Sequence, residues 1–196
     1  MGVSLITRPT SEPVTLAEAR KHLRIDTADL DSVIAAQIIA AREFAEGYTR
    51  RALVPQTWDF TYDWEWPSDR DGYRIIPPIA PLISVTHIQY VDANGATQTL
   101  AADQYQVVGL GDDSLPRIVP AYNVTWPSVR DQPEAVTVRC VCGYQFGSPA
   151  IASIPQALKQ AMLLHVEILH DRDIQQRETL EAARDALMSP YRVVRL

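Results

Sequence analysis

The chain has 196 residues, 46% of them apolar, and a formal net charge of −6. This length suits one compact domain or two small ones with a real hydrophobic core. Positions 56–149 carry eleven acidic and five basic residues, whereas the segments before and after them are each balanced. The sequence has no concentrated basic face, which argues against a sequence-specific DNA-binding protein.

The amino-terminal residues 1–13 are too short and too polar for a signal peptide. No apolar run reaches the ~18 residues that a membrane helix requires. Two cysteines in a chain of this length do not form a disulfide framework. We therefore expect a soluble protein that is made in a reducing cytoplasm and has no membrane segment.

Two helices are predicted at the amino-terminal end. The first is Thr15–Arg24, because its first residue can cap it and Glu18 completes a capping box. The second begins at Asp26 or Thr27, runs for about six turns and ends near Thr49. Its apolar residues recur at helical spacing over a stripe that is wide enough to contact more than one neighbour.

The stretch from Gln56 to Tyr144 has the alternating pattern and the turn residues of short β-strands. The predicted strands are residues 57–64, 84–91, 97–100, 105–108, 117–119 and 135–142.

Helical periodicity returns after Pro149. Ser153 is the expected N-cap of a helix that extends to Asp171, and a final helix is predicted from about Glu178 to Met188.

The predicted fold class is α+β, with a helical bundle formed by both chain ends and an inserted antiparallel β subdomain. Residues 1–55 and 150–196 form the expected helical core with a C-terminal tail, and residues 56–149 form the β subdomain. A doubly wound sheet is not expected, because the strand and helix patterns do not alternate along the chain.

Cys140 and Cys142 are the first candidates for a chemical site. They point to the same face of a predicted strand. A structural zinc site needs four ligands, however, and the sequence has no second cysteine pair and no suitably spaced histidine pair. We expect inert core thiols, with an adventitious metal or oxidation site as the alternative.

His165 and His170 lie five residues apart, which does not match the i, i+4 pair of a zinc-protease helix. We expect His165 to pack between helices and His170 to stabilise a helix C-terminus. No cofactor, metal ligand or catalytic residue is therefore expected.

Two pairs of carboxylates lie in loop-like sequence, Asp69 with Asp71 and Asp112 with Asp113. Paired carboxylates can act as acid and base in hydrolysis. A hydrolase is therefore kept as an alternative, although no other motif supports it.

Several stretches of the sequence are weakly specific alone but strongly specific in their order and spacing. They are Pro13–Asp26, Ala41–Glu46, Arg51–Trp58, Pro81–Thr86, Tyr90–Gly95, Arg117–Tyr122, Ile154–Ala161 and Ser189–Val194. Over nearly the full chain, this set resembles the head–tail connector (adaptor) proteins of tailed phages. The resemblance is to the long form of that family, which is found in prophages and gene transfer agents.

The resemblance implies a non-enzymatic protein of the virion neck, of which about twelve copies form a ring. Such a homo-oligomeric ring joins the portal protein to a stopper or tail-completion protein. DNA passes through the ring without specific binding, and no membrane is involved. Another neck protein, either a stopper or a tail terminator, is the first alternative.

The resemblance also implies that the C-terminal segment reaches the portal. The segment consists of Tyr191, Arg192, Val193, Val194, Arg195 and Leu196. The alternative is a terminus that packs back on its own domain. The acidic β subdomain is expected either to line the DNA passage or simply to form a soluble outer surface.

A ring requires one face of each subunit to match a different face of the next. The two long predicted helices, from about Asp29 and from Pro155, have apolar surfaces wide enough for both a core and a neighbour. The candidates for inter-subunit packing are Val33, Phe44, Leu164 and Ile168.

Overall fold

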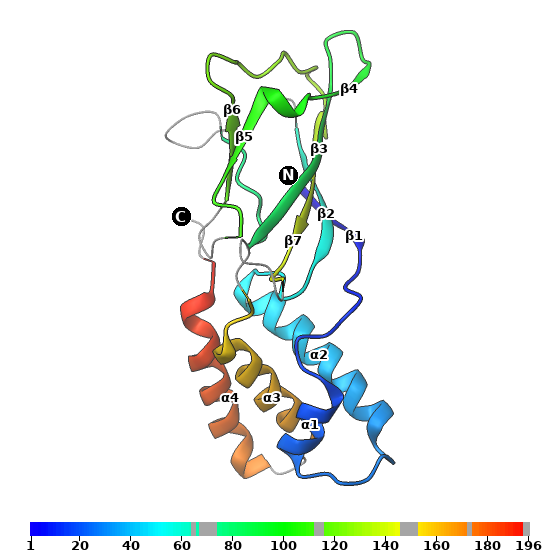
Figure 1. Cartoon of the computed structure of the whole chain (residues 1–196), viewed down its shortest axis with the longest axis vertical. Helices are drawn as coiled ribbons and strands as arrows, with labels where there is room; N and C mark the ends of the chain where they lie inside the picture. Colours follow the sequence, from blue (N-terminus) through cyan, green and yellow to red (C-terminus); the bar gives the residue numbers. More distant parts are fainter. Residues whose placement is uncertain (64–65, 67–73, 112–115, 146–152, 172–173, 194–196) are drawn as a thin grey trace. The chain divides into compact units, whose positions relative to one another are not determined.

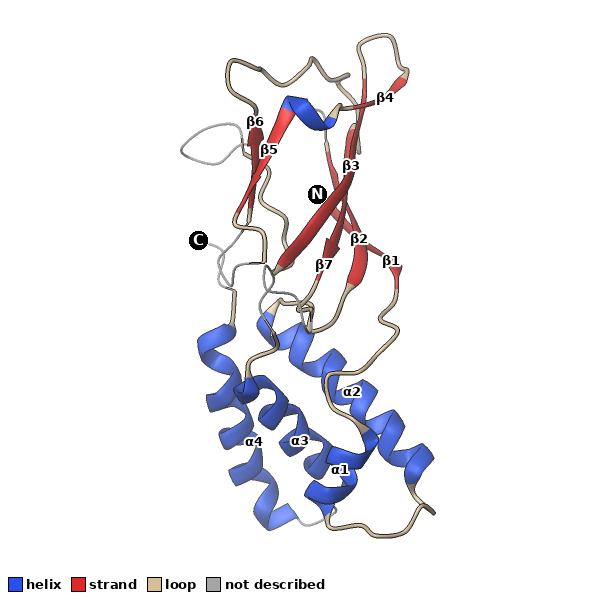
Figure 2. Cartoon of the chain, viewed as in Figure 1, coloured by secondary structure: helices blue, strands red, loops and turns tan. Residues whose placement is uncertain are grey.

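The computed structural model describes the chain except for residues 64–65, 67–73, 112–115, 146–152, 172–173 and 194–196, and the side chains of 174–175. The chain divides into two compact units (Figure 1). The β unit comprises Met1–Pro9 and Pro55–Ala152, and the helical unit comprises Thr10–Val54 and Ser153–Leu196. Among the described residues, four α-helices and two antiparallel sheets confirm the α+β class (Figure 2).

The β unit contains a five-stranded antiparallel sheet with the strand order β1-β2-β7-β3-β4. A two-stranded antiparallel ribbon, β5-β6, follows a short 3-10 turn. The strands are β1 Gly2–Thr7, β2 Gln56–Tyr62, β3 Leu82–Val91, β4 Thr97–Thr99, β5 Tyr105–Val108, β6 Arg117–Pro120 and β7 Val136–Cys142.

The central strand β7 shows how this sequence specifies a half-buried sheet. Its buried residues alternate with half-buried ones, so one face of the strand forms the core. The core face pairs Cys140 with Trp58 and Val138 with Phe60 on β2. On the opposite face, Arg139 is the register partner of Asp59, and the two form a bidentate pair at 2.7 and 2.6 Å. The strand register between β2 and β7 therefore places these two opposite charges directly beside each other.

The structure corrects one boundary. The sequence predicts residues 1–55 as part of the helical core, whereas Met1–Pro9 belong to the β unit and form the edge strand β1. Val3, Leu5 and Ile6 are all largely exposed in β1. An edge strand that pairs on one side and buries little gives only a weak period-two pattern, which explains why it is missed.

The helical unit contains α1 Leu16–Leu23, α2 Asp31–Thr49, α3 Gln156–His170 and α4 Ile174–Met188, with a 3-10 turn at Ser189–Tyr191. The predicted capping box is confirmed at α1. Thr15 Oγ1 accepts from the Glu18 amide at 3.2 Å, and Glu18 Oε2 accepts from the Thr15 amide at 2.7 Å.

The predicted start of α2 is wrong by about one turn, because the helix begins at Asp31. Arg20 explains the difference. It donates to the Asp26 carbonyl at 2.8 Å and lies 3.5 Å from the Asp31 carboxylate, which holds the connection in a non-helical path. The predicted N-cap of α3 is also wrong, since Pro155 occupies that position without a side-chain cap and Ser153 lies before it.

α3 contacts α1, α2 and α4, and it lies between α2 and α4 in the unit. The core comprises apolar residues of α2 and α3 at helical spacing. These are Ile34, Ile38, Ala41, Ala45, Leu158, Ala161, Met162, Val166 and Ile168. None of the helices among the described residues has the length and hydropathy needed to cross a bilayer.

One buried cation ties distant segments of the helical unit together. The Arg42 side chain is 8% exposed, and its Nε donates to Glu12 at 2.9 Å while its Nη1 donates to Glu46 at 2.8 Å. The other Glu46 oxygen accepts from the Leu53 amide at 2.9 Å. Arg42 and Glu46 together therefore join α2 to the segments on both sides of it, Arg42 through Glu12 and Glu46 through Leu53.

Glu46→Ala should lower the free energy of unfolding by about 2–3 kcal/mol, because it removes an acceptor from the buried Arg42 and from the Leu53 amide. Glu43 provides a matched control on the same helix. It is 65% exposed and 3.8 Å from Arg42, so Glu43→Ala should change stability by less than about 0.5 kcal/mol. Denaturant titration at neutral pH measures both values, and equal losses would contradict a structural role for the Glu46 network.

Candidate functional site

The outer face of α2 is the most unusual surface of the helical unit. Residues 32–41 contain no charged side chain, although half of this helix faces solvent. Ile34 and Ile38 are buried on the inner side, whereas Val33 and Ile39 are 46% and 43% exposed on the outer side. A surface helix normally carries charged residues on its outer face. This face is therefore suited to contact with another protein surface.

Exposed large apolar side chains of the helical unit lie on and beside α2, although not all on one side of it. Within the described part of the unit they are Leu30, Val33, Ile39 and Leu169. Leu30 precedes α2, two of the others lie on it, and Leu169 is contributed by α3. Such clustering distinguishes an interaction surface from isolated exposed apolar residues, which are common on any protein.

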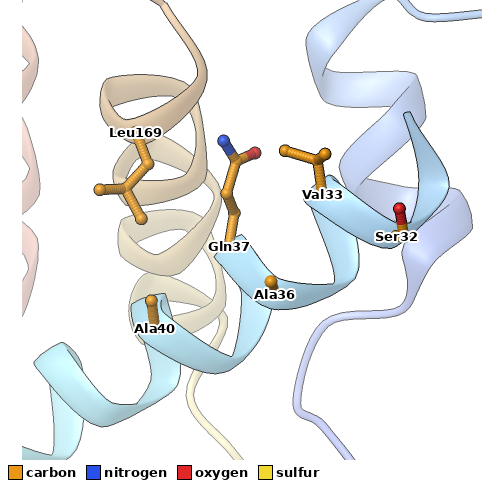
Figure 3. Close-up of a pocket in the computed structure, with 6 residues that line it drawn as sticks. All are labelled: Ser32, Val33, Ala36, Gln37, Ala40 and Leu169. Atoms are coloured by element: carbon orange, nitrogen blue, oxygen red, sulfur yellow. The ribbon is translucent and has the colours of Figure 1, made fainter.

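An open groove of about 490 Å³ lies on this face (Figure 3). It is lined by Ser32, Val33, Ala36, Gln37, Ala40 and Leu169. The only long polar side chain among them is held in place, since Gln37 Oε1 lies 3.3 Å from His170 Nδ1. The groove offers no titratable group for catalysis and instead provides small and aliphatic side chains for packing.

Of the four residues predicted to pack between subunits, only Val33 lines the groove. Leu164 is half-buried, and Ile168 is only 5% exposed, so it belongs to the core of its own unit and is withdrawn as a surface candidate. Sequence reasoning missed Ala36, Ala40 and Leu169. The uncharged run at 32–41 is the pattern that could have identified the first two.

Phe44 is half-buried and packs within its own chain. The Phe44 ring stacks on the His165 ring at a centroid distance of 4.3 Å. The guanidinium carbon of Arg184 also lies 4.3 Å from the centroid of the Phe44 ring. The Phe44 ring thus links α2, α3 and α4. A contact with a neighbouring copy would be secondary to this role.

His165 packs between helices, as the sequence predicts. Burial lowers its pKa, and the nearby positive charge of Arg184 lowers it further. The neutral ring can then accept a hydrogen bond at Nδ1 from Arg184 Nη1, at 2.9 Å. Arg184 also pairs with Asp185 at 2.8 Å, so the buried cation is balanced locally.

The proximal half of the C-terminal tail is attached to the helical unit. Arg51 Nε donates to the Tyr191 carbonyl at 2.7 Å, and the Val193 amide donates to the Thr49 carbonyl at 2.9 Å. Arg192 lies over the Tyr48 ring at 5.7 Å. The tail residues 191–193 therefore pack back on their own domain. Val194, Arg195 and Leu196 lie outside the described residues.

The chemical candidates do not converge on a site. Cys140 and Cys142 are free and buried in the core of the β unit, which confirms the expected location of the thiols. No group of three or more His, Cys, Asp and Glu side chains could hold a metal ion, as far as the chain is described. Both carboxylate pairs, at 69 and 71 and at 112 and 113, lie outside the described residues.

The family model that matches the chain is the phage gp6-like head–tail connector protein, over residues 13–78. No curated protein is significantly similar to the chain. Among solved structures, a chain in the neck of an empty gene transfer agent particle with C6 symmetry is 25% identical, with a TM-score of 0.76. A chain in the neck of the native particle with C12 symmetry is 26% identical, with a TM-score of 0.68. Both alignments cover 100% of this chain and 97% of the other.

A chain of the native gene transfer agent virion, 24% identical with a TM-score of 0.73, has the same fold. The family match and the two neck structures confirm the resemblance to head–tail connector proteins that the sequence predicts. The matched proteins are a connector family and chains of particle necks, which agrees with the expectation of a structural neck protein and gives the hydrolase alternative no support.

The two cysteines provide a test of the sheet core. Burial raises both pKa values, that of Cys142 to about 12, so the reactive thiolate is scarce at pH 8. We expect native protein to react with iodoacetamide at least about a hundredfold more slowly than protein unfolded in guanidinium chloride. Mass spectrometry over time measures the two rates. Rapid alkylation of the native protein would show that β7 is accessible.

Proposed function

We propose that this chain is a structural adaptor that forms a ring in the neck of a tailed phage or a phage-like particle. The ring joins the portal to the stopper or tail-completion protein and surrounds the DNA passage. The observation that carries this proposal is the full-length match to a neck chain, with a TM-score of 0.76 and coverage of 97% or more on both sides. The connector family match over residues 13–78 supports the same role.

The symmetry of the two matched necks supports a ring. They were solved with C6 and C12 symmetry, which is consistent with about twelve copies in this protein. Copies related by rotation alone contact each other through two different faces. The uncharged outer face of α2, with Val33 and Ala36, is suited to be one of them.

The charge of the β unit supports passage of DNA without specific binding. Residues 56–149 carry eleven acidic and five basic residues, and one of the basic residues, Arg139, is engaged by both oxygens of Asp59. DNA-binding surfaces gain affinity from free lysine and arginine side chains that neutralise phosphates. An acidic wall would instead let DNA slide past, whichever part of the unit faces the passage.

The proposed contact between the C-terminal tail and the portal involves a shorter segment than the sequence predicts. Tyr191 to Val193 are attached to the end of α2, so the proposed portal contact is confined to Val194, Arg195 and Leu196. Short terminal segments often order only on a partner. The attachment would present this segment from a fixed point on each subunit.

Deletion of the gene in a particle-producing strain tests the function. Heads should then fail to join tails, because no ring is available at the portal, and electron micrographs should show tailless heads. Complementation with the unaltered gene should restore tailed particles. Normal tailed particles without this chain would contradict the proposal. Tail loss combined with absence of the chain from wild-type necks would indicate an assembly factor instead.

Two truncations test the revised tail. Removal of residues 194–196 should leave the melting temperature unchanged and reduce capture by purified portal at least about tenfold. Removal of residues 191–196 also deletes the bonds to Arg51 and Thr49, and should cost about 1–3 kcal/mol of stability. Portal capture that survives the shorter truncation would show that the contact lies elsewhere.

A further inference from the structure

The outer face of α4 differs in shape from that of α2. After Glu178, Thr179, Ala182, Ala183 and Ala186 share one exposed face of α4 and are small and uncharged, while the partly exposed side chains of Glu181 and Asp185 lie to one side of this face. The inner side of α4 carries the buried Arg184 and Met188. The alanine face of α4 is therefore flat, whereas Val33 of α2 and Leu169 of α3 provide larger aliphatic side chains at the groove.

The two faces belong to helices on either side of α3. α3 packs against both α2 and α4, while α2 and α4 share few contacts. A subunit with complementary faces on two different helices meets the requirement of a ring closed by rotation. Packing α2 against α2 of a second copy would instead give a two-fold dimer, which cannot by itself close a ring of six or twelve copies.

The other outer surfaces of the helical unit are less suitable partners for the groove. The outer face of α1 carries Glu18, Lys21 and Arg24, all exposed. Covering these charges with the apolar groove would leave them without solvent and without partners, which is costly. On α4 the nearest carboxylates, Glu181 and Asp185, lie beside the small residues and are already paired with Arg177 and Arg184. The small residues themselves can be covered without burying a charge, and they let a facing helix approach closely enough for aliphatic side chains to interdigitate.

We propose that the outer face of α4 in the adjacent copy occupies the α2 groove and that this contact is the repeating interface of the ring. The proposal rests on the ring function proposed above and names the surface that completes it. The aliphatic side chains of Val33 and Leu169 pack against the alanines of the neighbour. Ala36 and Ala183 lie near the middle of their faces and should approach each other most closely.

Cysteine cross-linking in assembled particles tests this pairing. The variant with both Ala36→Cys and Ala183→Cys should give a ladder of multimers with a short bismaleimide. Native Cys140 and Cys142 are buried and should contribute no background. The matched control combines Ala36→Cys with Ala17→Cys, another exposed helical alanine, on α1, and should give no ladder.

The outcomes separate this inference from the function on which it rests. Efficient dimers from Ala36→Cys alone would mean that α2 faces α2, and would overturn the pairing. The absence of a ladder from the double variant, in necks that contain the chain, would overturn the pairing and leave the adaptor function intact. If the chain is missing from necks altogether, the adaptor function itself fails.

Charge insertion gives a second readout that does not depend on cross-linking. Ala36→Arg and Ala183→Arg should each reduce incorporation into necks at least about tenfold, because each places an unpaired guanidinium in the contact. Melting temperatures should stay unchanged, since both residues are exposed in the subunit. Ala17→Arg is the control and should incorporate normally. Normal incorporation of Ala183→Arg would exclude α4 as the partner surface.

Discussion

α2 contributes to two surfaces at once. Ile34, Ile38 and Ala41 are buried against the rest of the helical unit, while Val33 and Ile39 remain exposed on the other side of the same helix. An apolar outer face lowers solubility and adds nothing to the stability of an isolated subunit. Its physical advantage arises only when another surface covers it. The composition of α2 is therefore determined by the subunit core on one side and by an external contact on the other.

The polar groups of the helical unit show that the subunit is complete without this contact. The buried Arg42 is balanced by Glu12 and Glu46, and Arg184 is balanced by Asp185 and His165. Buried charges that lacked partners within the chain would tie folding to assembly. The uncovered face of α2 is apolar in the described structure, and exposing it costs far less in the free subunit than an unpaired buried charge would. This distribution is what we expect of a subunit that folds as a monomer and assembles afterwards.

The sequence predicted those structural features that depend on contacts between residues close together in the chain. The capping box of Thr15 and Glu18 involves residues three apart, and the alternation in β7 is a property of one strand, so both were recognisable from the sequence. Contacts between distant segments were not. Leu169 joins the groove only because α3 packs beside α2, and the tail is attached to Thr49 by a backbone bond that leaves no trace in residue type. The resemblance to connector proteins identified the class, but the positions of the surfaces required the structure.

The attachment of the tail at the end of α2 connects the two proposed contacts of the subunit. Thr49, the last residue of α2, accepts from Val193, so the described part of the tail is attached to the helix that also carries the groove. In a ring built through α2, every copy would then present its last three residues at the same position relative to its neighbours. A weak contact from each short segment, repeated around the ring, gives strong attachment because the later contacts form at high effective concentration. Such an adaptor would bind a symmetric portal firmly only as an assembled ring, and a free subunit would bind it weakly.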